Sequence, residues 1–128
     1  MILLDTCTLL WLALDQTQLS DNARSRIEDP DVQIWVSAVS AFELGQKYAR
    51  GSLKLGLSPD DWFNRALTSH RLQSLDLDAP AALRAAGLPR LHADPFDRLL
   101  IGTALEHRLT LLTPDPKIHA YPGVKVVW

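Results

Sequence analysis

The sequence predicts an α/β fold in which helices cover both faces of a central parallel sheet. Short apolar runs alternate with longer helical stretches from one end of the chain to the other. Serine, aspartate or proline stands where most of the helical stretches begin, as is typical of helix N-termini. Neighbouring parallel strands need a crossover connection, and a helix is the usual one. We therefore expect about five parallel strands between two layers of helices, with residues 1–128 forming a single domain.

The first half of the chain predicts two strands and four helices. An apolar run ends at Asp5, and a helical stretch follows it. Ser20 is placed to cap a further helix, and Gly51 suits the left-handed position after another. A serine, a proline and two early acids at residues 58–61 begin the last helix of this half. The predicted strands cover residues 1–4 and 33–36. The predicted helices cover residues 8–13, 21–28 and 58–70, and a further helix between the second strand and the last helix is opened by Ser37 and Ser40 and stops at Gly51.

The second half predicts two helices and three strands. Pro80 and Pro95 each stand in the first turn of a helix, close behind an aspartate. A turn over residues 113–116 then separates the last two strands. The predicted helices cover residues 78–87 and 94–106, and the predicted strands cover 72–77, 108–112 and 124–128.

Charge and cysteine content narrow the class of protein. The formal net charge of −2 argues against a protein that coats nucleic acid electrostatically. Any attraction for phosphate must then be local or carried by a metal. Cys7 has no second cysteine to pair with, which fits a reducing compartment. The longest apolar stretch, Leu9–Leu14, is far shorter than the roughly 20 residues of a membrane span. We expect a cytoplasmic protein with no membrane partner.

Several acids lie where a parallel sheet binds its ligands. Asp5 ends the first strand and Asp115 follows the fourth, and such sheets bind ligands at the carboxyl ends of their strands. Asp97 shares a helix face with Ile101 and Ala104, so its carboxylate should point toward the sheet. Carboxylates that converge there would form a hard-oxygen site for Mg²⁺ or Mn²⁺.

The same strand-end residues also have structural explanations. Asp5 is placed to cap the following helix, and Asp115 stands between two prolines as a turn residue. Thr6 and Thr113 lie beside these strand ends. Their hydroxyls either hold carboxylates by hydrogen bonds or serve as ordinary turn hydroxyls.

The helical acids are open to two explanations as well. Glu43 has the spacing of a capping box from Ser40 and of a surface ion pair with Lys47. Asp94 and Asp97 fit the N-cap and N3 positions of one helix, where the helix dipole favours carboxylates. A carboxylate that faces the sheet needs a partner, however, and a metal would offset the repulsion between several of them.

Other chemistries are excluded by missing residues. His92 and Asp94 have no further ligands at zinc-like spacing. A phosphatase with an aspartate nucleophile at Asp5 would need a second aspartate where Cys7 stands. No glycine-rich phosphate loop is present, which argues against a nucleotide hydrolase or a dehydrogenase. The remaining histidines are expected at the surface or at helix ends, and they are His70, His107 and His119.

Four segments in order along the chain resemble the motifs of the PIN-domain family, and particularly its VapC-like toxin nucleases. The most specific is residues 92–101, His-Ala-Asp-Pro-Phe-Asp-Arg-Leu-Leu-Ile, which is very close to the family's third motif. The other matching segments are residues 3–11, 37–53 and 112–128. The resemblance implies a PIN-like α/β/α sandwich in which an acid from each of several segments builds the metal site.

Carried over by position, this resemblance implies a metal and catalytic site made of Asp5, Glu43, Asp97 and Asp115. Asp94 is either an additional acid or a helix cap. The resemblance implies Mg²⁺ as the cofactor, with Mn²⁺ as an alternative. Asp5, Asp97 and Asp115 would bind the metal, and Glu43 would bind a second ion or position the attacking water.

The resemblance further implies an endoribonuclease that acts as the toxin of a type II toxin–antitoxin system. Its partners would be RNA and a small VapB-like antitoxin, and it would form a homodimer. Lys47, Arg50 and Arg98 either contact RNA phosphates or are solvated cations. The four tryptophans supply part of an interface or pack in the core.

Three alternatives stay open at this point. A housekeeping RNA-processing nuclease would share the chemistry but lack an antitoxin. A non-catalytic PIN-like module would bind RNA or protein through the same pocket, although the presence of all four matching acids argues against it. A metal-dependent phosphatase would hydrolyse small phosphate esters and ignore RNA.

Overall fold

The computed structural model describes residues 1–128 and contains a five-stranded sheet in which every paired strand is parallel to its neighbour. The strands are β1 (Ile2–Leu4), β2 (Ile34–Ser37), β3 (Gln73–Leu75), β4 (Thr110–Leu112) and β5 (Val126–Val127). Their order is β3-β2-β1-β4-β5, so β1 lies at the centre. The chain leaves β1 toward β2 on one side and returns to β4 on the other. The predicted parallel sheet is confirmed, and β1 and β4 flank its topological switch point.

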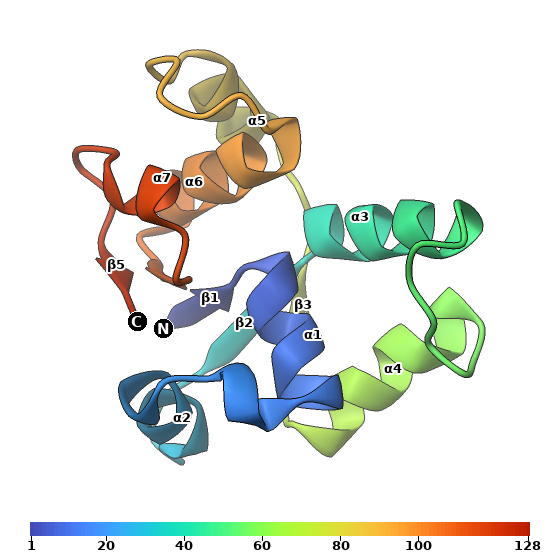
Figure 1. The fold of residues 1–128 in the computed structure, drawn as a ribbon. Helices are drawn as coiled ribbons and strands as arrows, with labels where there is room; N and C mark the ends of the chain where they lie inside the picture. The colour runs from blue at the N-terminus through green and yellow to red at the C-terminus, as the bar shows by residue number, and fades with distance from the viewer.

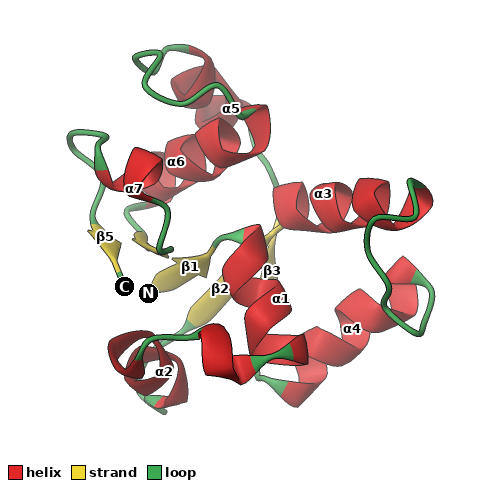
Figure 2. Cartoon of the chain, viewed as in Figure 1, coloured by secondary structure: helices red, strands yellow, loops and turns green.

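Helices cover both faces of this sheet (Figures 1 and 2). On one face lie α1 (Thr6–Leu14), α2 (Asp21–Glu28) and α4 (Pro59–Ser69), with a short 3-10 turn at Gln16–Gln18. On the other lie α6 (Pro95–His107) and α7 (Pro116–His119), and α5 (Ala79–Ala86) packs against α6. Helix α3 (Ala38–Ala49) starts directly from β2 and contacts α1, α4 and α6. None of these helices has the length and apolarity to cross a membrane.

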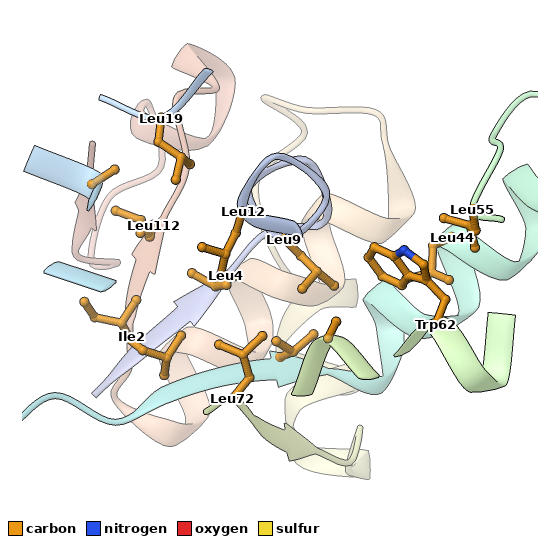
Figure 3. Close-up of a cluster of buried hydrophobic side chains, with 14 residues drawn as sticks. Ile2, Leu4, Leu9, Leu12, Leu19, Leu44, Leu55, Trp62, Leu72 and Leu112 are labelled. Atoms are coloured by element: carbon orange, nitrogen blue, oxygen red, sulfur yellow. The ribbon is translucent and has the colours of Figure 1, made fainter. Parts of the chain in front are cut away.

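Alternate side chains of β1 supply two separate cores. Ile2 and Leu4 belong to the cluster under α1, α2 and α4, whereas Leu3 belongs to the cluster under α6 and α7. Figure 3 shows the first cluster, with Leu9 and Leu12 of α1 above Leu4. Because every β1 side chain is buried, the strand reads as a continuous apolar run, as expected of a strand covered on both faces.

The structure corrects several predicted boundaries. Helix α1 begins at Thr6 instead of residue 8, because the Asp5 carboxylate accepts a hydrogen bond from the Thr8 amide and acts as the N-cap. Ser37 is the N-cap of α3, so the prediction of a capping box from Ser40 to Glu43 was wrong. The strand predicted over 72–77 is shorter, as is the one predicted over 124–128.

The turn predicted after β4 contains a helix that the sequence did not reveal. Asp115 accepts a hydrogen bond from the amide of Lys117 at 2.9 Å and caps the single turn of α7. A four-residue helix is too short to produce a hydrophobic period, so only its cap and proline could have marked it.

Candidate metal centre

Asp5 is a buried carboxylate at the carboxyl end of β1, with 4% of its surface exposed. Its Oδ1 accepts a hydrogen bond from the Thr8 amide at 2.8 Å, and its Oδ2 accepts one from the Thr113 hydroxyl. The Cys7 thiol lies 3.5 Å from Oδ1 and 3.6 Å from Oδ2. Burial raises the pKa of Asp5 above its usual value, against the opposing effect of the hydrogen bonds from Thr113 and Thr8. The site therefore begins with a carboxylate that is held in place and poorly hydrated.

Thr113 links the two strand ends at the switch point. While its hydroxyl donates to Asp5, it accepts a hydrogen bond from the Asp115 amide at 3.1 Å. The expectation that this hydroxyl holds a carboxylate is confirmed. The same expectation for Thr6 was wrong, because its hydroxyl donates to Ser40 at 2.9 Å and ties α1 to α3.

Glu43 brings a buried carboxylate from α3, with 8% of its surface exposed. Its Oε2 lies 3.0 Å from the ammonium nitrogen of Lys47, the predicted ion pair, in which 45% of the lysine side chain is exposed. Its Oε1 is buried and has no hydrogen-bond partner. An unpartnered buried carboxylate oxygen is costly, so a cation at this position would remove a penalty that the protein otherwise carries.

Asp97 and Asp115 converge on one histidine. The Nε2 atom of His92 lies 2.8 Å from Oδ2 of Asp97 and 3.2 Å from Oδ2 of Asp115. Ligand atoms of all three residues lie within 4.8 Å of one another. The Asp94 amide donates to His92 Nδ1 at 3.4 Å, so Nε2 carries the proton that faces the two carboxylates.

Burial and, after it, neighbouring charges shift the pKa of Asp97. Burial raises the pKa of its carboxyl to about 7, and the negative charge of Asp94 acts in the same direction. His92 lowers that pKa, whereas Asp5 and Glu43 raise it further. Asp94 itself caps α6 through a hydrogen bond from the Phe96 amide at 2.9 Å. It is thus a helix cap whose charge reaches the site.

His92 is the residue of the site that sequence reasoning missed. Of its two partners, Asp97 is five residues away and Asp115 is 23 residues away, so all three side chains meet only through the fold. The loop that carries His92 is held by Tyr121, whose hydroxyl accepts from the His92 amide at 2.9 Å and donates to the Pro89 carbonyl at 2.8 Å. The only sequence signal was its place at the start of the segment that resembles the third family motif.

Arg98 belongs to the same scaffold and does not face the acids. Its guanidinium donates to the carbonyls of Ala85, Leu88 and Pro89 at 3.0, 3.0 and 2.9 Å, and it lies 3.3 Å from the Tyr121 hydroxyl. A planar guanidinium suits such a fan of acceptors. The suggestion that Arg98 contacts RNA phosphates is therefore not supported, because both terminal nitrogens of its guanidinium already donate within the protein.

The donor set fits a hard divalent cation. Carboxylates come from the end of β1, from α3, from α6 and from the segment after β4. Those of Asp97 and Asp115 lie within 4.8 Å of each other, and the charges of Asp5 and Glu43 act on Asp97. Oε1 of Glu43 is buried without a partner. Among the titratable groups acting on Asp97, three carboxylates raise its pKa and only His92 opposes them, so the centre has an excess of negative charge. Oxygen ligands with excess negative charge are the chemistry that Mg²⁺ and Mn²⁺ prefer.

The fold and this acidic centre define a PIN domain. The PIN domain model matches residues 2–124, and the chain belongs to that family. Ribonuclease VapC22 of Mycobacterium tuberculosis is 31% identical, and the match covers 99% of this chain and 98% of that protein. PIN nucleases depend on metal ions, in keeping with the acidic cluster.

Solved structures share the fold across nearly the whole chain. VapBC2 of Rickettsia felis, bound to a DNA fragment from its promoter, has a TM-score of 0.76 at 20% identity and covers 99% of this chain and 98% of its own. DNA-bound VapBC of Salmonella typhimurium has a TM-score of 0.70 at 20% identity, with coverage of 98% and 96%. At these identities the likeness establishes the architecture.

Proposed function

We propose that this chain is a single-domain, metal-dependent endoribonuclease that acts as the toxin of a toxin–antitoxin pair. The observation that carries the proposal is the convergence of carboxylates at the switch point: Asp97 and Asp115 lie together beside His92, and the charges of the buried Asp5 and Glu43 act on Asp97. Oε1 of Glu43 is left unpartnered. A relative that matches along the whole chain is named a ribonuclease. Phosphodiester hydrolysis is a reaction that such a centre can support.

In this proposal Asp5, Asp97 and Asp115 hold Mg²⁺, with Mn²⁺ as an alternative. When bound, the divalent cation lowers the pKa of a water and offsets the charge that grows on the phosphate. Thr113 and the Thr8 amide keep the Asp5 carboxylate oriented. The Nε2 proton of His92 orients the carboxylates of Asp97 and Asp115.

Glu43 has a role separate from that of Asp5, Asp97 and Asp115, because its unpartnered carboxylate oxygen is held on α3. Burial and the Lys47 ion pair restrict the side chain, so Oε1 is available either to a second ion or to the attacking water. Lys47 lies on α3 four residues after Glu43, and the exposed Arg50 caps the C-terminal end of that helix. These two cations supply the local positive charge for RNA phosphates.

The proposed function includes an antitoxin as the protein partner of this chain. The structural neighbours described above are VapBC assemblies, and a toxin–antitoxin complex from Klebsiella pneumoniae shares the fold. We propose that a small VapB-like protein neutralises this chain. We further propose that the protein acts in the cytoplasm as a homodimer. A neighbouring gene for a small antitoxin would separate this role from that of a housekeeping RNA-processing nuclease.

The first test is cleavage of a mixed RNA panel, including transfer RNA, by purified protein free of antitoxin. We expect cutting with Mg²⁺, none with chelator, and loss of activity in Asp97→Asn. Asp76→Asn is the matched control, since Asp76 is exposed and lies outside the acidic centre. Equal loss of activity in both variants would contradict the assignment of Asp97.

Other outcomes favour the alternative functions. Folded protein that binds RNA but never cuts it would indicate a non-catalytic module. Hydrolysis of simple phosphate esters with indifference to RNA would indicate a small-molecule phosphatase.

A further inference from the structure

Two phenylalanines form an aromatic pair in which only one ring packs against a hydrophobic core. The ring centroids of Phe42 and Phe96 lie 5.8 Å apart, with the ring planes tilted by 55°. Phe96 is partly buried and packs against the cluster under α6 and α7. Phe42 belongs to neither cluster and is 59% exposed. The pair therefore consists of one anchored ring and one ring that presents much of its surface to solvent.

Each ring of the pair stands one residue before an acid of the centre. Phe42 is followed by Glu43 on α3, and Phe96 is followed by Asp97 on α6. The two helices that carry these acids contact each other, so the rings bridge the helices next to the carboxylates. An aromatic surface one residue from each of two acids is placed at the rim of the site.

Positive charge lies further along α3. Arg50 caps the C-terminal end of α3, about two turns beyond Phe42, and Lys47 pairs with Glu43 one turn after that acid. Arg50 is exposed, and 45% of the Lys47 side chain is exposed. One helix thus carries an exposed aromatic ring and cations, and surfaces that bind single-stranded nucleic acid use both.

We propose that the Phe42–Phe96 pair stacks an unpaired nucleobase of the RNA strand next to the phosphate that is cut. The inference rests on the proposed function, since that function brings an RNA phosphate to the carboxylates. A nucleobase is joined to its phosphate through a single sugar, so the neighbouring base necessarily falls at the rim of the centre. Stacking accepts any base, because every base has an aromatic face.

Stacking on the Phe42–Phe96 pair also distinguishes unpaired bases from bases in a duplex. A base inside a duplex is already stacked and paired, and it must be unstacked before it can reach a protein ring. Single-stranded loops and ends expose bases without that cost. The pair therefore favours an unpaired base at this one position and does not select which base it is.

Removing the exposed ring tests the proposal. In Phe42→Ala we expect KM for a single-stranded RNA oligonucleotide to rise about tenfold, with kcat changed much less, because a binding contact outside the chemistry is lost. Phe42→Tyr keeps the aromatic face and should restore KM. Leu83→Ala is the matched control, since Leu83 is 73% exposed on α5 and outside the centre. Because Phe42 is exposed, circular dichroism and Tm should be unchanged.

The substrate supplies a second test. The oligonucleotide is cut from a site mapped with the wild type, and each base near the cut is replaced in turn by an abasic residue. We expect one position at which the abasic substitution raises KM for the wild type but has little further effect on Phe42→Ala. Additive effects at every position would overturn the proposal.

Failure of the inference can be distinguished from failure of the proposed function. If the wild type cuts no RNA, the nuclease function fails. If the wild type cuts RNA and Phe42→Ala has the same KM, only the stacking inference fails. If Phe42→Ala keeps its KM but escapes inhibition by its antitoxin, the pair is part of a protein interface and the inference is overturned.

Discussion

Raising the pH should destabilise the metal-free protein, and Asp97 should account for much of the effect. Burial and neighbouring carboxylates raise the pKa of its carboxyl from 3.8 to about 7. Between these values the unfolded chain has lost the proton and the folded chain keeps it. The free energy of unfolding must therefore fall as the pH rises through this window.

The size of the effect follows from the two pKa values. Their difference corresponds to about 4 kcal/mol when the carboxyl is fully ionised. The side chain is 18% exposed, and solvent screens part of the interaction, so we expect roughly 2 kcal/mol between pH 5 and pH 8. For a domain of this size, this corresponds to a fall in Tm of roughly 6–10 °C.

Thermal unfolding in chelator at pH 5 and pH 8 measures this effect. Asp97→Asn removes the titrating group, so its Tm should change less between the two pH values than that of the wild type. The raised pKa of Asp5 acts in the same direction and should leave a residual slope in Asp97→Asn. The reasoning would be refuted if Asp97→Asn and the wild type lost the same stability between pH 5 and pH 8.

Added Mg²⁺ provides the second half of the experiment. Carboxylates must be ionised to bind a cation, so the increase in Tm on adding Mg²⁺ should be larger at pH 8 than at pH 5. Asp76→Asn should behave like the wild type. An Mg²⁺ effect that is equal at both pH values, or retained in full by Asp97→Asn, would place the cation elsewhere.

Two further predictions concern the packing that supports the site. Gly102→Ala should cost about 1–3 kcal/mol by urea unfolding, because a Cβ there would lie 2.5 Å from the carbonyl oxygen of Ala81 in α5. Gly45→Ala on α3 meets nothing within 4 Å and should instead stabilise by about 0.5–1 kcal/mol, so a shift of both variants in one direction would contradict the packing. Arg98→Lys keeps the charge but loses the planar fork that holds the loop before α6, so Tm and kcat should fall together while KM changes little. Unchanged Tm with a raised KM would instead make Arg98 a phosphate contact.

The fold class could be predicted because its signals are local. Each strand of a sheet covered on both faces is a short apolar run, and each helix start needs a residue that accepts a backbone hydrogen bond. The predicted start of a helix was wrong where two residues that suit the N-cap stand close together. Ser37 and Ser40 both suit an N-cap, and only packing decides that Ser37 caps α3 while Ser40 meets Thr6.

The acidic centre was predictable only in part. The rule that parallel strands bind ligands at their carboxyl ends pointed to Asp5 and Asp115, and the helical period directed Asp97 toward the sheet. The structure brings these carboxylates to one end of the sheet together with Glu43. Whether the four bind metal stays a prediction until it is measured.

The order of residues along the chain determines which segments can be strands, which can be helices and where caps and carboxylates stand, because these depend on neighbours a few positions away. Other features join residues from different elements. They are the strand order, the contact of His92 with Asp97 and Asp115, the hydrogen bonds of Arg98 to backbone carbonyls, and the contact of Phe42 with Phe96. They arise only when two apolar faces of one sheet are buried at once, since that burial sets the distances between helices. A local pattern carries no information about those distances.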